Sequence, residues 1–99
     1  MCGFRDIDRE TAIECVGKGW SGLINELYDF KPEYTKVVQV KEKFGGLRFY
    51  TDGTTEAFMN LIDDCEKRSY IICEECGKEG KIRENRAWIL TLCDECNAK

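Results

Sequence analysis

Two pairs of cysteines near the C-terminal end constrain the fold of this chain more than any other feature of its sequence. The motifs CEEC at 73–76 and CDEC at 93–96 give the spacing C-x2-C-x16-C-x2-C. Two cysteines three positions apart can direct both sulfurs at one tetrahedral ion when the backbone between them makes a tight knuckle. The spacing therefore predicts one metal site, with Cys73, Cys76, Cys93 and Cys96 as its ligands.

The residues around these pairs are typical of a zinc ribbon. Gly77 follows the first pair and Asn97 the second, and both residue types tolerate the left-handed conformation that a knuckle needs. The segment KIRENRAWILTL predicts two short strands joined around 84–86, which brings the pairs together. Zinc is the expected cofactor, with iron in a rubredoxin-like site as the alternative. Four protein ligands leave no open position, so a structural ion is expected.

The rest of the composition places the chain among small globular proteins of the cytoplasm. No apolar run approaches a membrane span, and the first ten residues, MCGFRDIDRE, lack a hydrophobic signal core. Thiols in the cytoplasm stay reduced, so seven cysteines favour a metal over disulfides. A chain of 99 residues buries a modest share of its surface, which a bound metal can offset.

Hydrophobic periodicity predicts helices on either side of a β-hairpin. A short helix capped by Asp8 or Thr11 precedes Gly17. A second helix places apolar residues at i, i+3, i+4 and i+7 from Trp20 and ends at Pro32. A third helix covers 54–69, with Thr54 or Thr55 as its cap and Phe58, Leu61, Ile62 and Cys65 as its buried stripe.

The segment between these helices, 36–51, predicts two strands that turn at FGG. Alternation places Val38 and Val40 on the core face and Lys41 and Lys43 on the other face. Gly45 and Gly46 are expected to supply the positive φ angles of the turn. Three apolar side chains are expected to enter the core from this hairpin: Phe44, Leu47 and Phe49.

Together these patterns predict an α+β fold: a small helix–hairpin–helix domain at 1–71 with a zinc ribbon at 72–99. Trp88 is expected to dock the ribbon against the domain. The expected core residues are Trp20, Leu23, Ile24, Leu27, Val38, Val40, Leu47, Phe49, Phe58, Leu61, Ile62 and Ile72.

The sequence argues against an enzyme. It contains no histidine, which removes the commonest general base and the Cys–His nucleophile pair. It has no phosphate-binding glycine loop, and its adjacent acids, such as Asp63 and Asp64, point apart on a helix. No convergent set of acid, base and nucleophile can be assembled.

Charge is distributed unevenly along the chain. The net charge is −4, yet residues 31–50 carry five basic and two acidic side chains, whereas residues 51–66 carry five acids and no base. A basic hairpin on an acidic body has two interpretations. The basic residues are solvated surface, or they bind an anionic, nucleotide-like ligand together with glycine N–H groups. The candidate ligand residues are Lys41, Lys43, Gly45, Gly46, Arg48 and Tyr50.

The segments GWSGLINEL and VQVKEKFGGLRFY, followed by a helix and a CxxC element, resemble a set of short bacteriophage and prophage proteins. The resemblance covers about residues 19–96 and implies a cytoplasmic protein of an infected bacterium that inhibits or redirects a host defence protein. The leading hypothesis is therefore a non-catalytic, zinc-containing phage accessory protein.

Two alternatives remain open. One is a sponge or sensor for a small anionic ligand at the hairpin. The other is a nucleic-acid-binding ribbon, although interleaved acids weaken its basic edge. The residues of that edge are Lys78, Lys81, Arg83, Arg86 and Trp88.

Overall fold

The structure is a computed structural model that describes residues 6–99. Its elements confirm the α+β class, with helices packed against one antiparallel hairpin and a second small hairpin near the C-terminal cysteines. In chain order the elements are α1 (Arg9–Cys15), the 3-10 helix η1 (Lys18–Trp20), α2 (Ser21–Phe30), β1 (Lys36–Lys43), β2 (Gly46–Asp52), α3 (Glu56–Ser69), β3 (Lys81–Arg83), β4 (Leu90–Leu92) and α4 (Asp94–Asn97).

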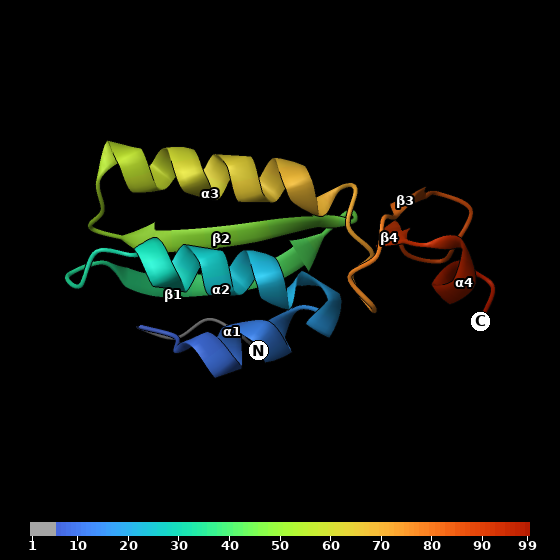
Figure 1. Cartoon of the computed structure of the whole chain (residues 1–99), viewed down its shortest axis with the longest axis horizontal. Helices are drawn as coiled ribbons and strands as arrows, with labels where there is room; N and C mark the ends of the chain where they lie inside the picture. The colour runs from blue at the N-terminus through green and yellow to red at the C-terminus, as the bar shows by residue number, and fades with distance from the viewer. Residues whose placement is uncertain (1–5) are drawn as a thin grey trace.

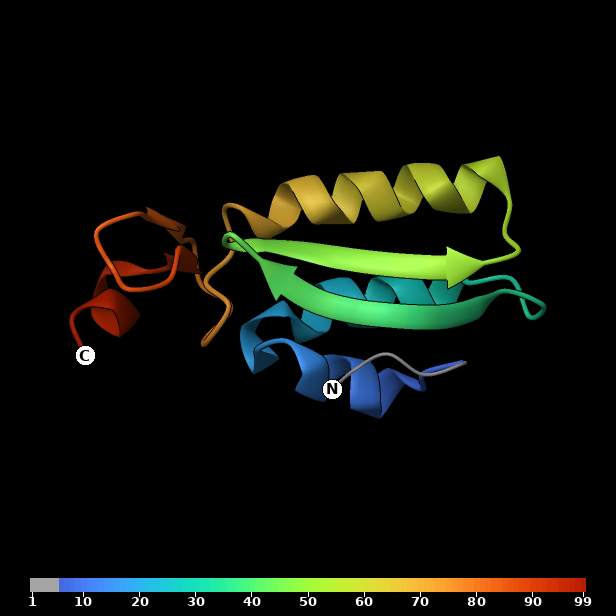
Figure 2. The same cartoon turned by 180° about the vertical axis from the view of Figure 1, so that it is seen from behind.

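The long β1–β2 hairpin carries helices on one side only (Figure 1). Seen from behind, the strands lie in front of α2, and none of the described helices crosses their outer face (Figure 2). The ribbon, formed by β3, β4 and α4, lies at one end of the molecule, beside the hairpin turn. One face of the hairpin is therefore core, and the other is open to solvent.

The helix boundaries follow local sequence signals. The Asp8 side chain caps α1 by accepting a hydrogen bond from the Thr11 N–H at 2.8 Å, as expected. Trp20 belongs to η1 rather than to the longer helix, because the chain makes a 3-10 turn before Ser21. The α2 helix ends before Pro32, where Lys31 is extended, since a residue before proline avoids the helical conformation.

A β-bulge in β1 changes which valines enter the core. Gln39 pairs with Tyr50 and Val37 pairs with Thr51, so Val38 is left without a partner of its own. The extra residue shifts the alternation by one position. Val37 and Val40 are fully buried, and the expectation that Val38 is a core residue is wrong.

The hairpin turn consists of Phe44 and Gly45, not of the two glycines. Both turn residues have positive φ, 53° and 83°, as a two-residue hairpin with the right twist requires. Gly46 already belongs to β2. Phe44 is 63% exposed, so the expectation that it enters the core is also wrong.

The α3 helix covers the free edge of β2 as well as the core. Thr55 caps the helix. Two side chains of α3 accept hydrogen bonds from strand N–H groups, Ser69 Oγ from Leu47 and Glu66 Oε2 from Phe49, both at 2.9 Å. These two N–H groups of the β2 edge are therefore satisfied within the chain and are not available to another strand.

The buried residues form two clusters. The larger lies between the helices and the hairpin and contains most of the expected core, with Leu61 and Ile72 half-buried at its margin. The smaller lies in the ribbon, where Leu92 packs with Cys73, Cys93 and Cys96.

Candidate metal centre and ligand surface

The four C-terminal cysteines converge on one point. Their sulfur atoms all lie within 4.8 Å of one another. Cys73, Cys93 and Cys96 are buried, whereas Cys76 is exposed. Four sulfurs at these separations could hold a metal ion.

Each cysteine pair is shaped by its own backbone device. Gly77 has a φ of 85° and donates its N–H to the Cys73 carbonyl at 2.9 Å, so the first knuckle forms as expected. The second pair opens α4 instead. Cys93 is the N-cap, and its sulfur accepts a hydrogen bond from the Cys96 N–H. Asn97 is the last residue of that helix and does not adopt the left-handed conformation that it tolerates. One helical turn already brings Cys96 back toward Cys93.

The thiols of the cluster differ in how readily they ionise. Burial disfavours the Cys73 thiolate, but backbone hydrogen bonds from Cys93, Cys76 and Glu75 outweigh it and lower the Cys73 pKa to about 6. The pKa of Cys96 is raised, mainly by its sulfur contact with Cys93. One thiolate forms easily, and its negative charge then opposes the ionisation of the neighbouring thiols. A divalent cation removes that repulsion, which makes metal binding linked to proton release.

The first knuckle docks tightly against η1 of the main domain. A Cβ on Gly17 would overlap the carbonyl oxygen of Glu74, and one on Gly19 would overlap that of Cys73. The Gly19 N–H donates to the Glu74 carbonyl at 2.9 Å.

Trp20 strengthens the same junction. Its indole N–H donates to the Ile72 carbonyl at 2.8 Å. Trp88, the residue expected to dock the ribbon, is 75% exposed, so that prediction is wrong. The reason is that Trp88 lies in the loop between β3 and β4, whereas the knuckle itself makes the contact.

The hairpin turn makes the second junction with the ribbon. The buried Thr91 hydroxyl donates to the Gly45 carbonyl at 2.6 Å. Glu74 ties the knuckle to the same strand, because its carboxylate accepts from the Thr91 N–H at 3.0 Å and its own N–H donates to the Thr91 carbonyl. These polar contacts explain why a small ribbon can hold a defined position.

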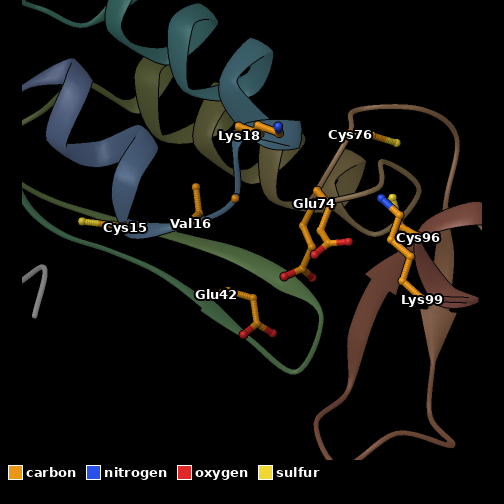
Figure 3. A pocket seen from close by; sticks show the side chains of 10 residues that line it. Cys15, Val16, Lys18, Glu42, Glu74, Cys76, Cys96 and Lys99 are labelled. Carbon is orange, nitrogen blue, oxygen red and sulfur yellow. The ribbon is translucent and has the colours of Figure 1, made fainter.

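A cleft of about 640 Å³ lies between β1 and the ribbon, and Lys18 and Lys99 line it together with its glutamates (Figure 3). Glu42 comes from β1 and Glu74 from the first knuckle, and Cys76 and Cys96 of the cysteine cluster also line the cleft. Burial raises the Glu74 pKa to about 7, with further contributions from nearby negative groups, Glu42 first. Sequence reasoning missed this cleft because its lining comes from separate parts of the chain, and no local pattern joins them.

The hairpin places part of the expected ligand set together. Lys41 is paired with Arg48 across the strands, and Lys43 and Tyr50 share their open face. Gly45 is buried, and its N–H donates to the Glu42 carboxylate at 2.6 Å, so this group is engaged within the protein.

Gly46 is engaged in a different way. It lies under the ring of Tyr70, which a Cβ at this position would overlap. The Tyr70 hydroxyl also accepts a hydrogen bond from Arg48 at 3.1 Å. Tyr70 was not among the expected ligand residues. Only its position at the end of a predicted helix hinted that it could reach the hairpin.

The basic side chains of the ribbon are largely paired with α4 and its end. Arg83 binds Asp94 at 2.7 Å and Lys78 binds Glu95 at 3.1 Å. Arg86 donates to the Asn97 side chain and carbonyl. Their charge is partly neutralised, which weakens the electrostatic attraction of this edge for a phosphate backbone.

Two other cysteines lie outside the cluster within the described residues. Cys65 is fully buried in α3, and burial raises its pKa to about 11, as expected for a core thiol. Cys15 forms a disulfide, so the expectation of reduced thiols is wrong for this residue. Cys2 lies outside the described residues.

Within residues 6–99, no helix has the length and apolar character needed to cross a membrane. Comparisons with models of protein families, with curated proteins and with solved structures give no match for this chain.

Proposed function

We propose that this protein is a non-catalytic zinc-binding protein that acts by binding a partner. The observation that carries the proposal is the convergence of four cysteine sulfurs within 4.8 Å in a knuckle docked on the main domain. Zinc suits this arrangement because it accepts four thiolates in a tetrahedral site without a preferred geometry of its own. The ion has a structural role, since the four sulfurs complete its coordination.

The proposed setting is the cytoplasm of a phage-infected bacterium, and the proposed partner is a host protein. Support comes from the sequence resemblance and from the net charge of −4. Acidic surfaces attract basic partners and speed their encounter.

Native mass spectrometry of the protein purified from bacterial cells tests the proposal. The expected species is one chain with one zinc ion, alone or joined to one host polypeptide. A Cys76→Ser variant should lose the metal, whereas Cys65→Ala, the matched change outside the cluster, should keep it. Iron in place of zinc, or full metal content in Cys76→Ser, would contradict the zinc assignment.

A second candidate function is the binding of an anionic ligand on the open face of the hairpin. The observation that favours it is the grouping of Lys41, Lys43 and Arg48 on one uncovered sheet face. A nucleotide-sized mass that accompanies the purified protein, and that Lys41→Ala fails to retain, would support it.

A further inference from the structure

The open face of the β1–β2 hairpin alternates cations with aromatic rings. On β2, Tyr50 and Arg48 lie on this face. At the next position on the face is Gly46, which has no side chain, and the ring of Tyr70 lies over it. Along β1, the same face carries Lys41 and Lys43. We call these five residues the hairpin face.

Contacts within the hairpin face hold its side chains in place. Arg48 donates to the Leu47 carbonyl and to the Tyr70 hydroxyl, both at 3.1 Å. The Lys41 ammonium lies 5.8 Å from the centre of the Tyr50 ring, a cation–π distance. The rings are thus fixed beside positive charge, which lowers the entropy lost when a ligand binds.

The charges of Lys41 and Lys43 are not neutralised within the described residues, whereas Arg48 is attracted to the carboxylate of Glu66 without forming an ion pair. Within residues 6–99, no carboxylate forms an ion pair with Lys41, Lys43 or Arg48. Glu42 is directed to the turn, where it accepts from the Gly45 N–H, and Glu66 is held at the strand edge by the Phe49 N–H. The two lysines therefore differ from Lys78 and Arg83 of the ribbon, which form ion pairs.

The shape of the hairpin face favours a polymer over a small molecule. Small ligands bind in concave sites that enclose most of their surface. The cleft beside the ribbon lies elsewhere, whereas the hairpin face is an uncovered sheet surface with Tyr50 42% exposed. Lys41 and Lys43 are two residues apart on a strand, about 7 Å, a step similar to that between successive phosphates of an extended single strand.

We infer that the hairpin face binds single-stranded nucleic acid. Bases stack on Tyr50 and Tyr70, and the backbone phosphates lie against Lys41, Lys43 and Arg48. Flat aromatic rings interleaved with cations are the usual means of holding single strands without reading their sequence. A duplex hides its base faces and cannot use the rings. This inference rests on the second candidate function, because it names the class of anion that the face would bind.

Fluorescence anisotropy with a labelled oligothymidylate tests the inference on the full, metal-loaded chain. We expect binding with a slope of log K against log salt of about −2, from three phosphate contacts. Tyr50→Ala should weaken binding roughly 10-fold, whereas Tyr50→Phe should retain it, because stacking needs the ring and not the hydroxyl. Lys41→Ala should reduce the salt slope by about 0.7. Lys67→Ala, a change of an exposed lysine on α3 outside the hairpin face, should alter neither value.

Several results would overturn the inference. They are the absence of binding at low salt, full affinity in Tyr50→Ala, and equal affinity for the same strand in a duplex. Unchanged thermal unfolding of Tyr50→Ala shows that a loss of affinity is not a loss of fold. Binding of inorganic tripolyphosphate without binding of the oligonucleotide would retain the second candidate function and reject the nucleic acid. Equal binding of poly-glutamate would reject the nucleic acid in the same way.

Discussion

Gly19 and Gly22 are three positions apart and have opposite roles. A Cβ on Gly19 would overlap the Cys73 carbonyl oxygen and crowd the Gly77 backbone, whereas one on Gly22 would meet nothing within 4 Å. We expect Gly19→Ala to destabilise the fold by about 2–4 kcal/mol, because the backbone atoms it meets cannot move aside cheaply. Gly22→Ala should stabilise α2 by about 0.5–1 kcal/mol.

Urea unfolding of the two variants measures both effects. Gly19→Ala should also lower metal retention, since the overlap pushes on the knuckle. Equal stability of Gly19→Ala and the unmodified protein would mean that the ribbon does not dock on η1 as described.

Phe44 is a non-glycine residue in a left-handed conformation, with a φ of 53°. An L-residue with a Cβ is disfavoured there, and asparagine tolerates this conformation best. The change Phe44→Asn creates an Asn-Gly turn, which suits a two-residue hairpin. Since the Phe44 ring is 63% exposed, little packing is lost.

We expect Phe44→Asn to raise the free energy of unfolding by about 0.5–1 kcal/mol. Phe44→Leu is the matched control, because it keeps the disfavoured conformation and should bring no gain. Thermal unfolding compares the two. A less stable Phe44→Asn protein would show that the exposed ring contributes packing that outweighs the turn.

At the scale of elements, the joint between α3 and β2 depends on a carboxyl group. Glu66 accepts the Phe49 N–H, and burial raises its pKa above the ordinary value of 4.5, with Asp63 adding to the rise while that hydrogen bond and Arg48 oppose it. A raised carboxyl pKa means that the folded state holds the proton more tightly than the unfolded state. The stability from Glu66 is therefore full below pH 4.5 and falls as pH rises through the folded pKa.

Glu66→Gln removes this titration and keeps an oxygen that accepts the Phe49 N–H. We expect the stability of Glu66→Gln relative to the unmodified protein to increase as pH rises through that window and then to level off. Urea unfolding across a pH series measures it. A difference that shrinks with rising pH would mean that the carboxylate's attraction to Arg48 dominates over its burial.

For the whole molecule, the junction between the proposed 1–71 domain and the 72–99 ribbon is monitored by Trp20. Trp20 is fully buried and donates a hydrogen bond to the carbonyl of Ile72, which precedes Cys73 of the cysteine cluster, whereas Trp88 is 75% exposed. In a Trp88→Phe variant, Trp20 is the sole tryptophan. Removal of the metal with a chelator should release the knuckle, lower the thermal midpoint and shift Trp20 emission to longer wavelength.

Added zinc should reverse both changes. If the metal leaves while the midpoint and the emission stay constant, the ion does not stabilise the junction, and its structural role is refuted.

The elements and the clustering of the four cysteines could be predicted because they depend on short-range patterns. Asp8 and Thr55 cap their helices through side chains a few residues away, and the cysteine spacing alone indicates one cluster. The bulge at Val38 could not be predicted, since its cause is pairing with β2 and not any preference of the valine. The exposed position of Phe44 could not be predicted for a similar reason. Either Phe44 and Gly45 or Gly45 and Gly46 could have formed the two-residue turn.

The sequence by itself determined the α+β class, the order of helices and strands, and the four cysteines that meet. Periodicity, capping and cysteine spacing are local patterns that can be recognised without knowledge of the fold. Only the tertiary structure decided how the ribbon docks, which face of the hairpin stays open and that Tyr70 covers Gly46. Those outcomes depend on close approach between segments distant in the chain, where the absence of a Cβ at Gly17, Gly19 or Gly46 matters only once its neighbour is in place.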